Sequence, residues 1–260
     1  MRPKVSSSTT GGDLQPLSSV AIGADGYLEA IVPLIQNLGD QHVAAAIQLA
    51  AQAAADALSG GGKIWLTPTS HCLHSEATYR AGGLMAVHIL NDPVLVRRGD
   101  CVIEGTPVGT SGLAIDCALN AKARGATLVA LTNVAFENDS QTILEHPTER
   151  RLHQIADIVV DLSGPIGDGI FSHPDTEEMR VIPHSGVTGM VAMWMILSEA
   201  VSLLLARGEA PRFYECIMIE GASERNNRER DAYLTSGSGV TTREELDHQV
   251  FDRSSNGRGG

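Results

Sequence analysis

The sequence predicts an α/β protein built on a parallel sheet that helices cover on both faces. Short apolar runs rich in β-branched and aromatic residues recur along the chain, among them KIWLT, CVIE, TLVALT and DIVVD. Small polar residues and helical segments follow several of these runs. This alternation is typical of βαβ units, in which a parallel strand buried on both faces reads as a continuous apolar run.

The expected elements follow in chain order. Residues 26–58 predict a helical stretch whose second part, HVAAAIQLAAQAAADAL, consists almost wholly of strong helix formers and can be capped by Asp40. The expected strands are KIWLT, MAVHIL, CVIE, TLVALT, DIVVD and, late in the chain, FYECIMI. The longest apolar run, residues 189–206, is interrupted by Glu199 and falls short of the ~20 residues that a membrane-spanning helix needs. We therefore expect it to be a core or subunit-interface helix.

The composition excludes several classes of protein. With 260 residues, of which 43% are hydrophobic, the chain can bury a sizeable core, which excludes global disorder. Its 19 basic against 31 acidic residues give a formal net charge of −12, which argues against a nucleic-acid partner. The four cysteines form no CxxC pair, and no apolar signal region follows the N-terminus. These features favour a cytoplasmic protein that handles a small molecule, without a membrane partner.

The domain organisation follows from the distribution of apolar residues. We expect residues 1–20 to be a disordered tail, residues 21–235 to be a single domain that includes the N-terminal helices, and residues 236–260 to be a largely flexible extension. Residues 43–58 and 190–205 form two apolar helical segments that one domain of this size has limited room to bury. Because exposing either would leave a large apolar patch, we expect a homo-oligomer, either a dimer or a tetramer.

Two hydroxyl-rich loops follow expected strands. TPTSH (67–71) comes after KIWL, and TPVGTSG (106–112) comes after CVIEG. Backbone N–H groups at a helix start, beside Ser and Thr hydroxyls, form a cradle for phosphate, sulfonate or carboxylate, although these hydroxyls can also serve only as helix caps. Neither loop matches a P-loop or GxGxxG motif. The residues expected to hold a ligand are Ser70, Thr106, Gly109, Thr110 and Ser111.

An ordered set of motifs carries a resemblance to a known family. The segment SHCLHSEATYRAGGL (70–84) resembles the SIS, or sugar isomerase, domain family, most closely a poorly characterised bacterial branch with a G-H-S-H…E-E-x-x-Y-R-A-G-G-L pattern. ALNAKARGATLVALTN, HPTERRLHQIADIVVDLSGPIGDG, HSGVTGMVA and GASERNN follow in the same order. The S-H-C triplet is also similar to the first loop of phosphoheptose isomerases. The resemblance covers residues 25–235 and implies a three-layer αβα sandwich with a central, mainly parallel, five-stranded sheet.

The resemblance also implies a ligand. SIS domains generally bind phosphosugars and commonly pair, so that sites form near subunit boundaries. Two departures concern the phosphate grip: Thr106 and Val108 stand where the family usually has S-x-S, and Thr67-Pro68-Thr69 replaces a glycine-rich first loop. Fewer hydroxyls and a stiffer turn leave open a sugar phosphate, another anion or an uncharged sugar.

The activity that the resemblance implies is aldose–ketose isomerisation, in which a base moves a proton between C1 and C2 through an enediol. Glu76 is the expected base, since it would lie one turn into a helix that starts near His71, where the helix dipole favours a carboxylate. The alternative is a solvated helix carboxylate. His71 and His184 are the expected acid–base partners. Glu76 also falls where phosphoheptose isomerases place a zinc-binding histidine, so a divalent metal such as zinc, held by His71, His74 and Glu76, stays open.

Two other functions remain open. One is a non-catalytic phosphosugar-binding module, as SIS domains attached to regulators are, and the other is a lyase or amine-releasing deaminase on the same scaffold. Three further polar residues have structural interpretations. His88 is expected to be a core histidine, His146 a loop-structuring or catalytic residue, and Asp168 a turn residue that could bind sugar hydroxyls.

Overall fold

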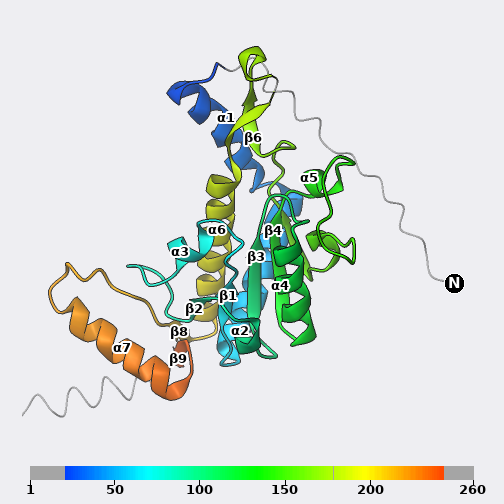
Figure 1. Cartoon of the computed structure of the whole chain (residues 1–260). Helices are drawn as coiled ribbons and strands as arrows, with labels where there is room; N and C mark the ends of the chain where they lie inside the picture. The colour runs from blue at the N-terminus through cyan, green and yellow to red at the C-terminus, as the bar shows by residue number, and fades with distance from the viewer. Residues whose placement is uncertain (1–20, 178, 243–260) are drawn as a thin grey trace, which may run out of the picture.

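A five-stranded parallel sheet forms the centre of the molecule (Figure 1). The computed structural model describes residues 21–177 and 179–242. The strands lie in the order β2-β1-β3-β4-β5, and every neighbouring pair is parallel. Their bounds are β1 Ile64–Leu66, β2 Val87–Ile89, β3 Cys101–Gly105, β4 Thr127–Thr132 and β5 Ile158–Asp161. The predicted parallel sheet is confirmed.

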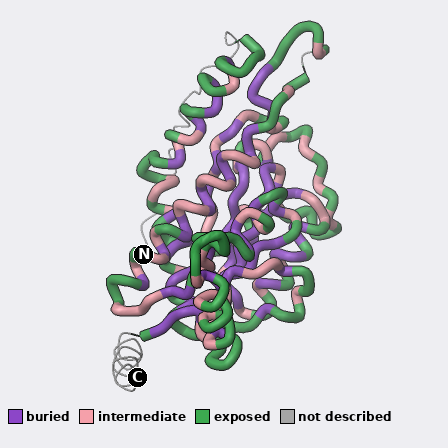
Figure 2. The backbone as a smooth tube through the Cα atoms, turned by 90° about the vertical axis from the view of Figure 1, so that its left-hand side faces the viewer, coloured by how far each residue is buried: buried purple, intermediate pink, exposed green. Residues whose placement is uncertain are grey.

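Helices cover both faces of this sheet. The helices are α1 Ala24–Asn37, α2 Gln41–Ser59, α3 Leu73–Ala77, α4 Gly112–Ala123, α5 Val134–Asn138, α6 Ser185–Ala206 and α7 Ala222–Ser236. On β3, Ile103 packs in the core that α2 and α6 share with the sheet, whereas Val102 packs in the core on the α4 side. The expected three-layer αβα sandwich is therefore confirmed, and Figure 2 shows the buried backbone concentrated in its middle.

A small lobe projects beyond the sandwich (Figure 1). Strands β6 Gly169–Ser172 and β7 Arg180–Pro183 form an antiparallel hairpin. Ile170 and Phe171 of the hairpin pack against Ala30, Ile31 and Leu34 of α1 in a separate apolar cluster. This hairpin was not expected from the sequence.

Two predicted elements differ from the structure. The helical stretch 26–58 is two helices, and Asp40 occupies the N-cap position of α2 without a side-chain cap hydrogen bond. The strand expected at FYECIMI is wrong: Phe213 forms an isolated bridge with Leu84, Tyr214 N donates to Gly83 O (2.9 Å), and the run joins none of the described sheets. Met218, in the apolar part of this run, is 87% exposed, and no strand of the described residues pairs with it.

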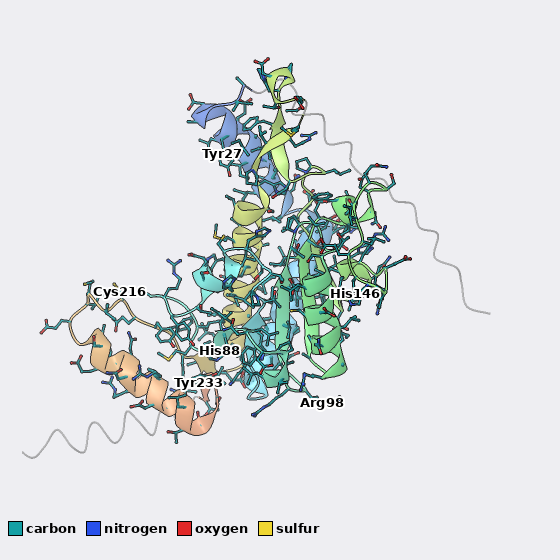
Figure 3. All side chains as sticks on the ribbon, viewed as in Figure 1. Tyr27, His88, Arg98, His146, Cys216 and Tyr233 are labelled. Atoms are coloured by element: carbon teal, nitrogen blue, oxygen red, sulfur yellow. The ribbon has the colours of Figure 1, made fainter. Side chains whose placement is uncertain are left out.

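The C-terminal boundary also differs from the expectation. Strand β9 Val240–Thr242 pairs with β8 Glu209–Pro211, and Val240 is buried, so the packed body continues beyond residue 235. His88 Nε2 lies 2.6 Å from the Tyr233 hydroxyl, which ties α7 to the sheet (Figure 3). The expected tail 1–20 and most of the expected extension, 243–260, lie outside the described residues.

Helix α6 is long and apolar enough to cross a membrane by length and composition alone. In the structure it packs along α2 and the sheet, where Met193 and Ile196 are buried. A groove of about 560 Å³ remains between α2 and α6, lined in part by Trp194 and Met195. The expected homo-oligomer stays a prediction. This groove is an apolar surface that a second copy of the chain could cover.

Candidate functional site

The two hydroxyl-rich loops meet at the carboxyl edge of the sheet. The strand order reverses between β1 and β3, which is where open α/β sheets bind ligands. Thr67 N donates to Ile103 O (3.3 Å), and a Cβ atom on Gly105 would lie 2.9 Å from the Ser70 Cβ. The predicted neighbourhood of the two loops is therefore observed, and Gly105 permits their close approach.

A small hollow lies beside these loops. Its polar lining comes from three separate segments: His71 after β1, Thr106 after β3 and Ser185 at the start of α6. The rest of the lining is Leu73, Gly105, Pro107, Leu131, Leu162 and Gly189. The hollow has about 10 Å³ of space, room for one water molecule, so a sugar needs the loops to move apart.

The first loop forms hydrogen bonds within itself. Ser70 is buried, and its hydroxyl donates to the carbonyl oxygen of Thr67. His71 is exposed and has a left-handed backbone conformation, with φ of 49°. Helix α3 begins only at Leu73, later than the sequence predicts, so His71 and His74 do not share a helix. Among the expected residues of this loop, only His71 reaches the hollow.

The second loop also uses its polar groups internally. Ser111 Oγ accepts from Ala114 N (3.4 Å), so Ser111 caps α4 as the alternative interpretation foresaw. Thr110 is buried, and Thr106 Oγ1 lies 3.5 Å from Gly109 N. Gly109 has φ of 60°, and a Cβ atom there would lie 2.2 Å from Glu137 Oε1. Ligand binding by this loop stays a prediction, with Thr106 the member that lines the hollow.

Glu137 holds the second loop in place, and no feature of the sequence pointed to this residue. Its buried carboxylate accepts hydrogen bonds from the Thr132 hydroxyl and from His153, whose Nδ1 lies 2.6 Å from Oε2. Burial raises the pKa of Glu137. Its backbone oxygen accepts from Arg151 Nε (2.7 Å). These bonds turn the Glu137 side chain against Gly109 and hold the loop against the sheet.

The His184 side chain is fully buried. It has no exposed surface, and Nδ1 lies 3.1 Å from the Thr188 hydroxyl. Nε2 lies 3.4 Å from Asp168 Oδ1 but has no hydrogen-bond partner in the described part of the chain. Burial lowers the pKa of His184, against the opposing effect of Asp168, so the imidazole is neutral at pH 7. A Cβ atom on Gly164 would lie only 1.8 Å from Nε2.

Asp168 is the accessible member of this cluster. It accepts from Ser185 Oγ (2.9 Å) and Ser185 N (3.1 Å), and its side chain is 21% exposed. Asp168 therefore joins the β6–β7 hairpin to the start of α6 beside the hollow. Because His184 is enclosed behind Asp168 and Gly164, the expected acid–base role of His184 can act only through its neighbours.

Glu76 lies outside the lining of the hollow. It is on α3, forms an ion pair with Arg80, and its side chain is 34% exposed. The Arg80 guanidinium lies over the Trp194 ring, 5.9 Å from its centroid. This surrounding matches the interpretation of Glu76 as a solvated helix carboxylate, and its role as the base stays a prediction.

The expected zinc ligands do not converge. Residues 21–177 and 179–242 contain no group of three or more His, Cys, Asp or Glu side chains placed to hold a metal ion. His71 precedes α3, whereas Glu76 pairs with Arg80. The donor set of the described residues does not fit a zinc centre.

Glu104 is a buried acid at the end of β3 that the sequence analysis missed. It accepts from the Thr69 hydroxyl, while its Oε2 has no partner within the described residues. Burial raises the pKa of Glu104 to about 7, against hydrogen bonds from Thr69 and Thr67. The available signal was an acidic residue inside the apolar strand CVIEG.

Replacing Glu104 by glutamine should make the stability less dependent on pH. The folded-state pKa is raised to about 7 from 4.5, so the folded protein binds the proton more tightly and loses stability as pH rises between these values. From pH 5.5 to 8.5 this single group should lower the free energy of unfolding by about 2 kcal/mol. Chemical denaturation of both proteins at the two pH values measures the difference. Equal pH dependence in the native protein and Glu104→Gln would contradict it.

The fold defines a class of protein: an αβα sandwich in which two polar loops meet at the carboxyl edge of a parallel sheet. The chain belongs to the UPF0309 family, an uncharacterised bacterial family, as the motifs led us to expect. A UPF0309 protein of Thermoanaerobacter pseudethanolicus is 30% identical over 185 residues, covering 60% of this chain and 74% of the relative. One of Geobacillus thermodenitrificans is 29% identical over 216 residues, covering 72% and 86%. No family model matches the chain.

A solved structure similar to this chain is that of a phosphoheptose isomerase of Neisseria gonorrhoeae, with a TM-score of 0.43 and 15% sequence identity. The similarity covers 68% of this chain and 94% of that one. Another is the Vibrio vulnificus NanR protein complexed with ManNAc-6P, with a TM-score of 0.45, 14% identity, and coverage of 81% and 69%. Both likenesses are too distant to assign an activity.

Proposed function

We propose that the protein binds a sugar at the carboxyl edge of β1 and β3 and interconverts its aldose and ketose forms. The observation that carries the proposal is the convergence of His71, Thr106 and Ser185 on one hollow from three separate segments. Polar groups that converge at a strand-order reversal are typical of a small-molecule site. The SIS motifs in the sequence favour a sugar as that molecule.

Isomerisation through an enediol needs a group that removes the C2 proton and a group that polarises the carbonyl. His71 is exposed beside the hollow and supplies a proton donor or acceptor. Glu76 is the carboxylate base once it leaves Arg80. Thr106 and Ser185 bind substrate hydroxyls. Asp168 accepts a hydrogen bond from Ser185 and holds it in position. His184, next to Asp168, is a positioning residue.

A non-catalytic sugar-binding module is the second candidate. It is favoured by the enclosure of His184 and by the Glu76–Arg80 ion pair, since both keep an expected acid–base residue away from the hollow. A binding module needs the converging hydroxyls but no proton transfer.

Proton exchange at C2 separates the two candidates. An isomerase that forms an enediol exchanges the C2 proton of its aldose with solvent, so incubation with a panel of aldoses in D₂O should replace that signal in proton NMR spectra. The panel contains free sugars and their phosphate esters, and each sugar is also tested by thermal shift, because a ligand of the native state raises its stability. Stabilisation without exchange would show a binding module, and neither effect with any sugar would contradict the proposed function.

A further inference from the structure

We infer that the second loop excludes phosphate and that the substrate is an uncharged sugar rather than a sugar phosphate. This inference rests on the proposed function, since it names the substrate class of the same site. It is carried by two of the chain's own acids, Glu145 and Glu104, and by the lack of Lys and Arg in residues 67–72 and 106–111.

Glu145 occupies the position that an anion would take. Its Oε2 accepts a hydrogen bond from Gly112 N (3.0 Å), the first residue of α4, and its backbone N donates to Thr110 O (3.2 Å). Next to it, His146 Nε2 lies 3.2 Å from Asp116 Oδ1 on α4. Glu145 is thus attached to both the loop and the helix start. Because Ser111 Oγ accepts from Ala114 N, a second N–H of this helix start is also in use.

A phosphate at this helix start would have to displace a carboxylate that makes the same kind of bond. Free N–H groups and the positive end of the helix dipole are what make a helix start attractive to anions. Here Glu145 already supplies the negative charge and takes the Gly112 N–H group. An uncharged sugar needs neither the free N–H groups nor the helix dipole, because its hydroxyls can bind the groups that line the hollow.

Glu104 is a second acid beside the two loops, since its carboxylate accepts a hydrogen bond from the Thr69 hydroxyl of the first loop. It is fully buried at the end of β3, directly before the loop, and forms no ion pair with any described residue. When it is ionised, no cation offsets its charge, and repulsion inside a protein is poorly screened. An anion bound over the second loop would therefore meet a second negative charge.

No cation in the loops compensates for these acids. Residues 67–72 and 106–111 contain no Lys or Arg. His71 is the one basic side chain that lines the hollow in the described structure. The neighbouring Arg151 directs its Nε to the backbone oxygen of Glu137. Sites for phosphate esters usually add Lys or Arg to helix N–H groups, so the charge pattern here favours an uncharged ligand.

Sulfate tests the anion cradle without any sugar. Thermal shifts are measured at pH 8 for the native protein, for Glu145→Ala, for Glu145→Ala combined with Glu104→Gln, and for Glu224→Ala as a control that removes one exposed glutamate from α7. Sulfate stabilises proteins in general by exclusion from their surfaces, and this effect cancels between variants. We expect a saturable extra shift only after Glu145 is removed, with about tenfold tighter binding in the double variant. Saturable binding by the native protein, or none by the double variant, would overturn the inference.

Matched sugar pairs complete the test. Free aldoses and ketoses are compared with their phosphate esters, using the same thermal-shift and C2-exchange measurements on the native protein. Free sugars should give the larger effects, and preference for the esters would overturn the inference. If no sugar of either kind acts while the sulfate result holds, the proposed function fails but the closure of the cradle by Glu145 stands, so the two failures are distinguishable.

Discussion

Replacing Gly164 by alanine should destabilise the protein by about 3 kcal/mol or more, since overpacking a closed core forces side chains and backbone to shift. The added Cβ atom would lie 1.8 Å from His184 Nε2, inside the imidazole ring's own contact distance. The ring has no room to retreat, because it is fully buried and bonded through Nδ1 to Thr188. Chemical denaturation of the variant measures the loss.

A second variant identifies the cause of this loss. Adding His184→Ala to Gly164→Ala removes the ring that clashes, so the double variant should recover part of the stability, with a coupling of about 2 kcal/mol between the two positions. Gly186→Ala is the matched control, because the nearest heavy atom to its new Cβ would be Cys72 Sγ at 4.0 Å. Additive effects of the two substitutions would show that Gly164 matters for another reason.

The sheet could be predicted from the sequence because its strands carry their own signal. β3 and β4 are apolar runs whose residues are nearly all buried, and β3 leads into a polar loop whereas β4 leads through Asn133 into α5. The adjacency of the two loops also followed, since parallel strands place their carboxyl ends on one edge of the sheet. The expected number of five strands came from the family resemblance rather than from the residue pattern, and the strand order was not predicted.

The polar contacts of the site could not be predicted, because their partners are distant in the chain. Glu104 meets Thr69, and Asp168 meets Ser185, through the fold alone. The hairpin beside α1 was missed for a related reason: GIFS and RVIP are too short to stand out without the cluster that buries them. The late apolar run FYECIMI was predicted to be a strand and is not one. An apolar run becomes a strand only where a neighbouring strand is available to pair with it.

Replacing Glu76 by glutamine should lower turnover by about a factor of 10² to 10⁴, because the substitution keeps the shape and removes the basicity that general-base catalysis requires. The substrate is whichever sugar shows C2 exchange with the native protein. Its KM should change little, since the variant loses an interaction with the transferred proton and keeps the hydroxyl contacts of the hollow. Steady-state kinetics and the C2 exchange rate should fall together.

Three measurements separate a base from the other roles of Glu76. Glu224→Gln on α7 controls for the loss of one exposed carboxylate and should leave turnover unchanged. Elemental analysis of native protein and variant tests for a metal ligand, since loss of a metal would lower both metal content and activity, and chelation of the native protein would reproduce it. Near-native turnover of Glu76→Gln would exclude both roles. The base would then be sought at His71, which already lines the hollow and has no ion pair with any residue that the structure describes.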